Sequence, residues 1–393
     1  MKVRQHHDLS ISELGVGCYA LSGVYGRKDP GEFIQMLHRA CEMGVTFFDT
    51  AAAYGEDAER VLGEGVASYR NEVIIATKIG PSESGGPDLS PQHIRASCER
   101  SLRNLGTDWI DVYQVHYDDP NTPVEVTIGA LEDLQREGKI RHYGLSHLPL
   151  PRVEQYLQSG RPSTMLMELS AVSREARSTL LPLCRAHGLA GIAFSPTGRG
   201  LLTGRFDAGT TFPPGDLRRI DPLFQRERFS SGLRIAARLA EIAARHGKTP
   251  VQAAIAWVLA QPGIVCALSG PSTIEHLEEN AGGTGWEFDA EEMVSFERFL
   301  SQEEAGLRRA QHRAVHDILA APLPPDTSQA FTDLVYAVET AILLGLFDEA
   351  DVIAPFRELF GLQNRQDADA RRQMVAIQAR LREMLPAPES TDR

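Results

Sequence analysis

Eight short apolar runs recur between residues 13 and 268, and several of them are apolar at successive positions instead of alternate ones. Strands of that kind are typical of parallel sheets covered by helices on both faces. The stretches between the runs are amphipathic, so strand and helix patterns alternate along the chain. Eight strand–helix units predict an α/β fold of the (β/α)8 TIM-barrel type. The runs cover residues 13–18, 46–49, 73–77, 109–115, 140–145, 164–168, 191–194 and 264–268.

Residues that begin and end helices support this division. Ser90 and Thr249 are each followed by proline, which favours an N-cap and a first helical turn at these points. Glycines that favour helix ends follow four of the amphipathic stretches, at Gly44, Gly106, Gly138 and Gly188.

The barrel pattern stops near residue 300, so we expect a barrel domain over 1–300 and an α-helical extension over 301–393. A proline-rich break at 321–326 predicts a linker, and helices are expected over 331–346, 354–362 and 366–385. An apolar stripe in the first of these helices needs a partner. The sequence leaves open whether that partner is the barrel wall or a second subunit of a homo-oligomer. The stripe comprises Leu334, Val335, Val338, Ile342 and Leu346.

Composition narrows the range of partners. The net charge of −13 argues against nucleic acid or an anionic membrane surface as a partner. No apolar run is long enough to cross a membrane, and the first seven residues do not resemble a signal peptide, so we expect a cytoplasmic protein. Neither cysteine nor His/Asp/Glu spacing suggests a metal site.

Four polar residues follow apolar runs at the points where strands should end. They are Asp49, Tyr54, Lys78 and His116. The carboxyl ends of barrel strands meet at one mouth, where catalysis occurs in such folds. The sequence therefore predicts an acid, a phenol, an amine and an imidazole at one site.

These four groups form a consistent set for protonating an oxygen that is becoming an alkoxide. A tyrosine has an ordinary pKa of about 10, and a neighbouring ammonium such as Lys78 should lower it. Asp49 would hold the lysine charged, and His116 would donate a hydrogen bond to the substrate oxygen. Because the sequence offers no evident nucleophile, a hydride from a nicotinamide is the expected attacking group. The alternative for Asp49 and Lys78 is a purely structural salt bridge.

Six stretches of the chain resemble the aldo-keto reductase superfamily: GVTFFDTAAAYG (44–55), IATK (75–78), DWIDVYQVH (108–116), GKIRHYGLS (138–146), FSPTGRGLLTG (194–204) and LEEN (277–280). They lie within residues 8–300. The resemblance implies NAD(P)-dependent interconversion of aldehydes or ketones with alcohols. It also implies that Tyr54 is the proton donor, tuned by Lys78 and Asp49, and that His116 orients the carbonyl.

The resemblance implies a set of cofactor and substrate contacts as well. Phe194 would stack on the nicotinamide, Ser146 would meet its carboxamide, and Tyr19 would line the substrate pocket. The loop from Ser195 through Gly198 and Gly200 to Leu201 would wrap the pyrophosphate, where glycine lets the backbone come close. Glu279 and Asn280 would meet the adenine.

Three departures from the family pattern affect the cofactor. A glutamine usual in the sixth strand is replaced by Leu166, and an asparagine usual after the fifth-strand serine is replaced by His147. Residues 270–280 lack the lysine or arginine that usually binds the 2′-phosphate. The family pattern favours NADP(H), whereas the missing basic residue is consistent with use of NAD(H). The residues offered there instead are Gly270, Ser272, Thr273 and His276.

The leading hypothesis is an NAD(P)-dependent aldo-keto oxidoreductase acting on a small carbonyl or sugar-like substrate. One alternative is an NAD-linked sugar dehydrogenase. A different class of alternative is a dinucleotide-sensing or scaffold barrel whose helical extension binds a partner.

Overall fold

The computed structural model describes residues 1–55, 57–82, 85–213 and 215–386. The chain divides into two compact units, one of Met1–Phe206 with Ile235–Glu292 and one of Asp207–Arg234 with Met293–Arg393. The expected boundary at residue 300 lies inside the long helix α10 (Ala290–Ala320), and residues 207–234 group with the C-terminal helices. One reason is packing, since Ile220 contacts the apolar core of that second unit and Arg226 pairs with Asp333 there.

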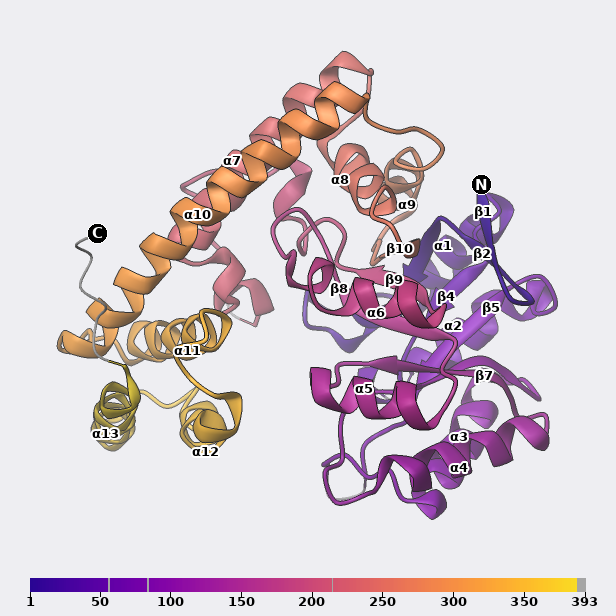
Figure 1. The fold of residues 1–393 in the computed structure, drawn as a ribbon, viewed down its shortest axis with the longest axis horizontal. Helices are drawn as coiled ribbons and strands as arrows, with labels where there is room; N and C mark the ends of the chain where they lie inside the picture. Colours follow the sequence, from indigo (N-terminus) through magenta and orange to yellow (C-terminus); the bar gives the residue numbers. More distant parts are fainter. Residues whose placement is uncertain (56, 83–84, 214, 387–393) are drawn as a thin grey trace. The chain divides into compact units, whose positions relative to one another are not determined.

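The first unit is built on a closed barrel of eight parallel strands, in the order β10-β3-β4-β5-β6-β7-β8-β9 (Figure 1). Each of the eight apolar runs in the sequence forms one of these strands, which confirms the predicted TIM barrel. The barrel strands are β3 (Leu14–Gly17), β4 (Phe47–Asp49), β5 (Ile74–Lys78), β6 (Ile110–Val115), β7 (Ile140–Ser146), β8 (Thr164–Glu168), β9 (Ala190–Phe194) and β10 (Ile264–Ser269).

Helices follow the barrel strands and begin and end largely where the sequence indicated. Ser90 accepts a hydrogen bond from the backbone of His93 at the start of α3, and Thr249 forms a capping box with Gln252 at the start of α8. The helices of this unit are α1 (Pro30–Glu42), α2 (Ala58–Val66), α3 (Pro91–Leu105), α4 (Val124–Arg136), α5 (Leu150–Ser159), α6 (Leu180–His187), α8 (Pro250–Leu259) and α9 (Ile274–Ala281). Helix α7 (Arg226–Arg245) passes from the second unit into the first.

The barrel interior determines which side chains reach the mouth. Side chains along a strand alternate between faces, so residues two apart share one face. One apolar cluster contains Phe47, Ala76, Val112, Leu166 and Ile192, which come from β4, β5, β6, β8 and β9. Two residues further along the same strands, at or near the carboxyl ends, stand Asp49, Lys78, Gln114, Glu168 and Phe194. On these five strands the inward-facing side chains therefore change at the mouth from aliphatic residues and Phe47 to Asp49, Lys78, Gln114, Glu168 and Phe194.

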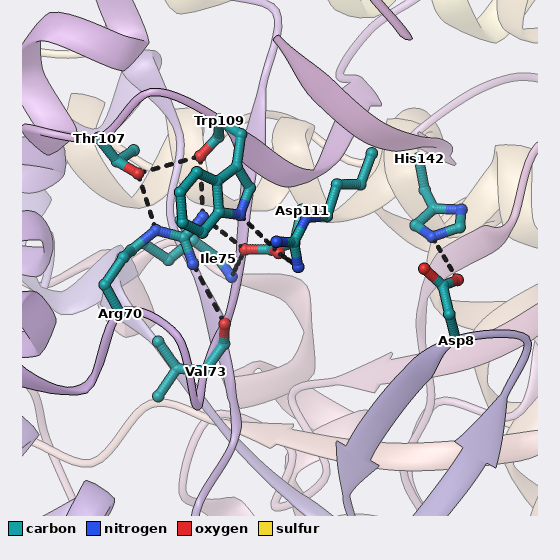
Figure 2. A network of polar contacts seen from close by, with 9 residues as sticks. Asp8, Arg70, Val73, Ile75, Thr107, Trp109, Asp111 and His142 are labelled. Atoms are coloured by element: carbon teal, nitrogen blue, oxygen red, sulfur yellow. Dashed lines mark hydrogen bonds and ion pairs between the residues drawn. The ribbon is translucent and has the colours of Figure 1, made fainter. Parts of the chain in front are cut away.

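The opposite end of the barrel carries a polar network (Figure 2). Asp111 accepts hydrogen bonds from the backbone of Ile75 and the indole of Trp109, at 3.0 and 3.1 Å. It also pairs with Arg70 at 2.7 Å and with Arg141 at 3.0 Å, and both guanidiniums lie over the Trp109 ring. These residues lie before their strands or within the first two residues of them. In TIM barrels this end of the strands contributes to stability, so we assign the network a stabilising role.

A hairpin of β1 (Val3–His6) and β2 (Leu9–Ser12), which the sequence did not predict, closes this end of the barrel. Leu9 and Ile11 join the interior apolar cluster, and Asp8 at the turn lies 2.8 Å from His142 (Figure 2).

The second unit has its own core. Leu334, Val335 and Val338 of α11 (Thr327–Leu343) are buried in an apolar cluster with side chains of α10, α12 (Glu349–Phe360) and α13 (Ala368–Met384). Gln378 of α13 also donates to the backbone of Ile318 in α10. The apolar stripe of α11 therefore has its partner inside its own unit. Among the described residues, none of the helices has the length and apolar character that crossing a membrane requires.

Candidate active site

Lys78 is the centre of the polar cluster at the barrel mouth. It ends β5 with a fully buried side chain, and its Nζ donates to three oxygens: Asp49 Oδ1 at 2.6 Å, the Thr50 carbonyl at 2.8 Å and Tyr54 Oη at 3.2 Å. Tyr54 comes from the short 3-10 helix η2 (Ala52–Tyr54) that follows β4. Asp49, Tyr54 and Lys78 are thus brought into direct contact.

The charge state of the lysine follows from these contacts. Burial alone would lower the pKa of Lys78, but the Asp49 carboxylate and the Tyr54 hydroxyl outweigh it and raise that pKa above its ordinary value. With three oxygen acceptors around it, the ammonium stays charged. Lys78 and Asp49 therefore form a buried ion pair.

The pKa of Tyr54 differs in direction from the one expected from the sequence. Burial raises the pKa of Tyr54 above its ordinary value, although the ammonium of Lys78 opposes this. The expectation that Lys78 lowers this pKa below its ordinary value is wrong in its net direction, because desolvation of the phenolate is the larger effect. The phenol remains protonated at neutral pH, which is the state that a proton donor needs.

His116 completes the group from the end of β6. It is 3% exposed, and its ring centroid lies 6.1 Å from that of Tyr54 and 4.1 Å from the stacked ring of Tyr117. Burial, together with the charge of Lys78 and with His147, lowers the pKa of His116 to about 2. The imidazole is therefore neutral and can donate one N–H hydrogen bond.

Aromatic rings surround this centre. The Tyr19 ring, 39% exposed, lies 5.0 Å from the Tyr54 ring. On the other side His147 lies 5.9 Å from His116 and 5.2 Å from Phe194. Although His147 reaches solvent, the protein atoms around it and the charge of Lys78 lower its pKa to about 4. The predicted residues Tyr19, His147 and Phe194 thus lie around the four central ones.

The loop after β9 contains four residues with a left-handed backbone. Ser195, Gly198, Arg199 and Gly200 all have positive φ, of 53°, 58°, 53° and 94°. A left-handed residue within a turn can direct neighbouring backbone N–H groups toward one side, where they can bind an anion. The loop is closed by hydrogen bonds from Gly198 to Ser195 and from Leu201 to Gly198.

The remaining predicted residues lie before and along α9, from Gly270 after β10 to Asn280 in the last turn of the helix. Thr273 is the N-cap and accepts from the His276 backbone at 3.2 Å, and Ser272 Oγ lies 3.5 Å from His276 Nδ1. Asn280, in the same helix, is 8% exposed, and Gly270 directly follows β10. Arg205 reaches this cluster from the end of the β9 loop, 2.6 Å from His276 Nε2 and 3.0 Å from Glu279 Oε2.

The model of the Aldo/keto reductase family matches residues 13–300. The chain belongs to this family. Aldo/keto reductases generally carry out NAD(P)-dependent carbonyl reduction, so this chain belongs among the oxidoreductases. The match ends at residue 300, inside α10, and does not include α11, α12 or α13.

Sequence and structural similarity to individual family members supports this assignment. An aldo-keto reductase, str7 of Strobilurus tenacellus, is 33% identical over 305 residues, which is 75% of this chain and 90% of that protein. The solved glycerol dehydrogenase AKR11B4 of Gluconobacter oxydans is 28% identical with a TM-score of 0.70, and the match covers 77% of this chain and 95% of that one. The holo form of aldo-keto reductase AKR11C1 of Bacillus halodurans is also 28% identical, with a TM-score of 0.63 and coverages of 76% and 96%.

Two polar residues at the proposed site were not predicted from the sequence. Gln114, two residues before His116, donates from Nε2 to Asp49 Oδ2 at 2.8 Å, so both oxygens of that carboxylate are held. Gln114 could have been predicted from its spacing, because it lies two residues after the inward-facing Val112 of β6 and therefore faces the barrel interior. Arg205 is a basic residue beside His276, where residues 270–280 provide no lysine or arginine. Arg205 and His276 lie far apart in the sequence, so spacing along the chain does not reveal their contact.

One further group is set apart from the mouth of this aldo/keto reductase. Among the described residues, His246, Asp289 and Glu292 have potential metal-ligand atoms within 4.8 Å of one another. The carboxylate of Glu292 already pairs with His246 at 2.7 Å and with Arg245 at 2.9 Å. We therefore assign these residues to holding the start of α10.

Proposed function

We propose that the protein is an NAD(P)-dependent oxidoreductase that interconverts a carbonyl compound and an alcohol, with Tyr54 as the proton donor. The observation that carries this proposal is the set of contacts of Lys78 Nζ, which joins the Tyr54 hydroxyl to a buried carboxylate. A purely structural salt bridge would not need the phenol as a third member.

The side chains at the mouth divide the proton chemistry among them. When bound, the nicotinamide cofactor supplies the hydride that attacks the carbonyl carbon. Tyr54 Oη donates its proton to the carbonyl oxygen as negative charge develops there. The charged Lys78 stabilises the phenolate that remains, and Asp49 keeps Lys78 in position. The neutral His116 donates an N–H hydrogen bond that orients the same oxygen.

The residues present fit the cofactor. The positive-φ loop from Ser195 to Gly200 offers backbone N–H groups to a pyrophosphate. Phe194 ends β9 beside His147 and can stack on a planar ring. Buried polar atoms of Ser146 and Glu168 have no hydrogen-bond partner within the described chain.

We propose that both NADP(H) and NAD(H) are accepted. Arg205 can bind a 2′-phosphate by a charge-assisted contact. Its present partner Glu279 would compete for the guanidinium, and that carboxylate can also accept a hydrogen bond from the free 2′-hydroxyl of NAD(H). The balance of these two side chains would set the preference.

We propose a small carbonyl or polyol-like substrate. One of the solved relatives is named a glycerol dehydrogenase, and two exposed tyrosines, Tyr19 and Tyr117, flank the central residues. Such side chains offer both apolar ring area and hydroxyl groups.

The decisive experiment follows the loss of absorbance at 340 nm with NADPH and NADH over a panel of small aldehydes, ketones and aldoses. We expect turnover by the wild-type protein and almost none by Tyr54→Phe. Equal rates for the two proteins would refute the acid role of Tyr54.

A dinucleotide sensor with a partner-binding extension is the second candidate. It is favoured by the helices beyond residue 300, which lie outside the family match. In that case the protein would bind cofactor without turning over any member of the panel. Light scattering of the full chain during size-exclusion chromatography would test whether the helices also form an oligomer.

A further inference from the structure

Two buried polar atoms at the barrel mouth suggest how one end of the nicotinamide is recognised. Within the described chain, Ser146 Oγ and Glu168 Oε1 have no hydrogen-bond partner. Leaving a buried donor or acceptor unsatisfied is costly, so such atoms usually meet a ligand or water. The two residues are the last ones of the neighbouring strands β7 and β8.

The strand register places both residues on the inner face of neighbouring strand ends, close to the strand end that carries Phe194. Ser146 is paired with Leu166 across β7 and β8, and Glu168 is paired with Phe194 across β8 and β9. Leu166 belongs to the interior apolar cluster. Glu168, two residues later, therefore faces the same interior at the mouth, next to the strand end that carries Phe194.

Arg199 holds the Glu168 carboxylate in a defined orientation. Its Nη2 lies 3.0 Å from Glu168 Oε2, which leaves Oε1 as the free acceptor. An ionised carboxylate only accepts hydrogen bonds, whereas the Ser146 hydroxyl can donate one. One acceptor and one donor on neighbouring strand ends match a primary amide, which offers an NH2 group and a carbonyl oxygen.

We propose that Glu168 is a positioning residue for the nicotinamide carboxamide: Oε1 accepts from its NH2 group while Ser146 donates to its carbonyl oxygen. This inference rests on the proposed function. Glu168 thereby makes a hydrogen bond to the carboxamide that the apolar side chain of Leu166 cannot make. Because the carboxylate can only accept, the site requires an N–H donor on the ring substituent.

The requirement can be tested with a cofactor analogue. In 3-acetylpyridine adenine dinucleotide phosphate a methyl group replaces the NH2 group, so the proposed contact with Glu168 cannot form. The analogue and NADP+ would be titrated by calorimetry into the wild-type protein, Glu168→Gln and Glu168→Leu. Glu175→Gln is the matched control, because it makes the same chemical change at an exposed glutamate in the segment after β8.

We expect the wild-type protein to bind NADP+ about tenfold more tightly than the analogue, as the loss of a charge-assisted hydrogen bond predicts. Glu168→Leu should remove most of this preference by weakening NADP+ binding alone, and Glu168→Gln, which retains an acceptor oxygen, should remove less of it. Glu175→Gln should behave as the wild type does.

Equal affinity of the wild-type protein for the two ligands would overturn the inference without any substitution. A preference unchanged in a folded Glu168→Leu variant would overturn it as well. If the wild-type protein bound neither NADP+ nor NAD+, the proposed function itself would fail.

Discussion

Lys78 Nζ lies 2.6 Å from Asp49 Oδ1, and both side chains are almost completely buried in the mouth of the barrel. A buried ion pair contributes little net stability, because desolvation offsets most of the attraction. Its value here lies in keeping a charged ammonium 3.2 Å from the Tyr54 hydroxyl.

Lys78→Met should reduce kcat at least 100-fold, because the phenolate of Tyr54 loses its stabilising charge. It should also lower the free energy of unfolding by about 3–5 kcal/mol, since Asp49 is left buried without its partner. The double variant Lys78→Met with Asp49→Asn separates the two effects. It should regain much of the stability and none of the activity; recovery of both would show that Lys78 acts only through folding. Steady-state kinetics and urea unfolding measure these changes.

Arg205→Ala should weaken binding of NADPH about tenfold and leave binding of NADH within about twofold, because only NADPH carries the phosphate that the guanidinium would contact. Dissociation constants for both reduced cofactors check this. An equal loss for both would mean that Arg205 maintains the loop and does not read the phosphate.

The free energy of unfolding of the protein without cofactor should decrease as the pH is lowered, because of His116. Its pKa is about 2 in the folded protein and 6.5 in the unfolded chain, so folding favours the neutral ring. Above pH 6.5 the ring is neutral in both states, so its titration does not affect stability. Below pH 6.5 the unfolded chain binds a proton that the folded protein does not bind. The free energy of unfolding should therefore fall by about 2 kcal/mol between pH 7 and pH 5. Urea unfolding of the wild type and of His116→Asn should give curves whose difference changes by that amount. A constant difference across this range would contradict the assigned pKa.

Asp111→Ala should destabilise the protein by about 3–5 kcal/mol, because Arg70 and the Ile75 N–H lose a buried acceptor. The residue lies at the end of the barrel opposite the mouth, so kcat per folded molecule should stay within about twofold. Unfolding curves and active-site titration test the two statements together. A large loss of kcat in fully folded protein would show coupling between the two ends.

The sequence was most informative where local pattern decides structure. Continuous apolar runs located all eight barrel strands, and Ser90 and Thr249 marked real helix starts. It was least informative where contacts join distant segments. The approach of Arg205 to His276 and the Gln114 contact with Asp49 depend on the closed barrel. The direction of the Tyr54 pKa depends on burial, which spacing along a chain does not reveal.

The central claim is that the Tyr54 phenol, supported by Lys78, delivers the proton to the carbonyl oxygen. The most direct test is the single-turnover rate of NAD(P)H oxidation by an activated aldehyde, measured by stopped flow with all protein bound to cofactor. The account predicts that Tyr54→Phe slows this step by about 100-fold to 10,000-fold while the dissociation constant of the cofactor stays unchanged. A rate within twofold of the wild type would contradict it.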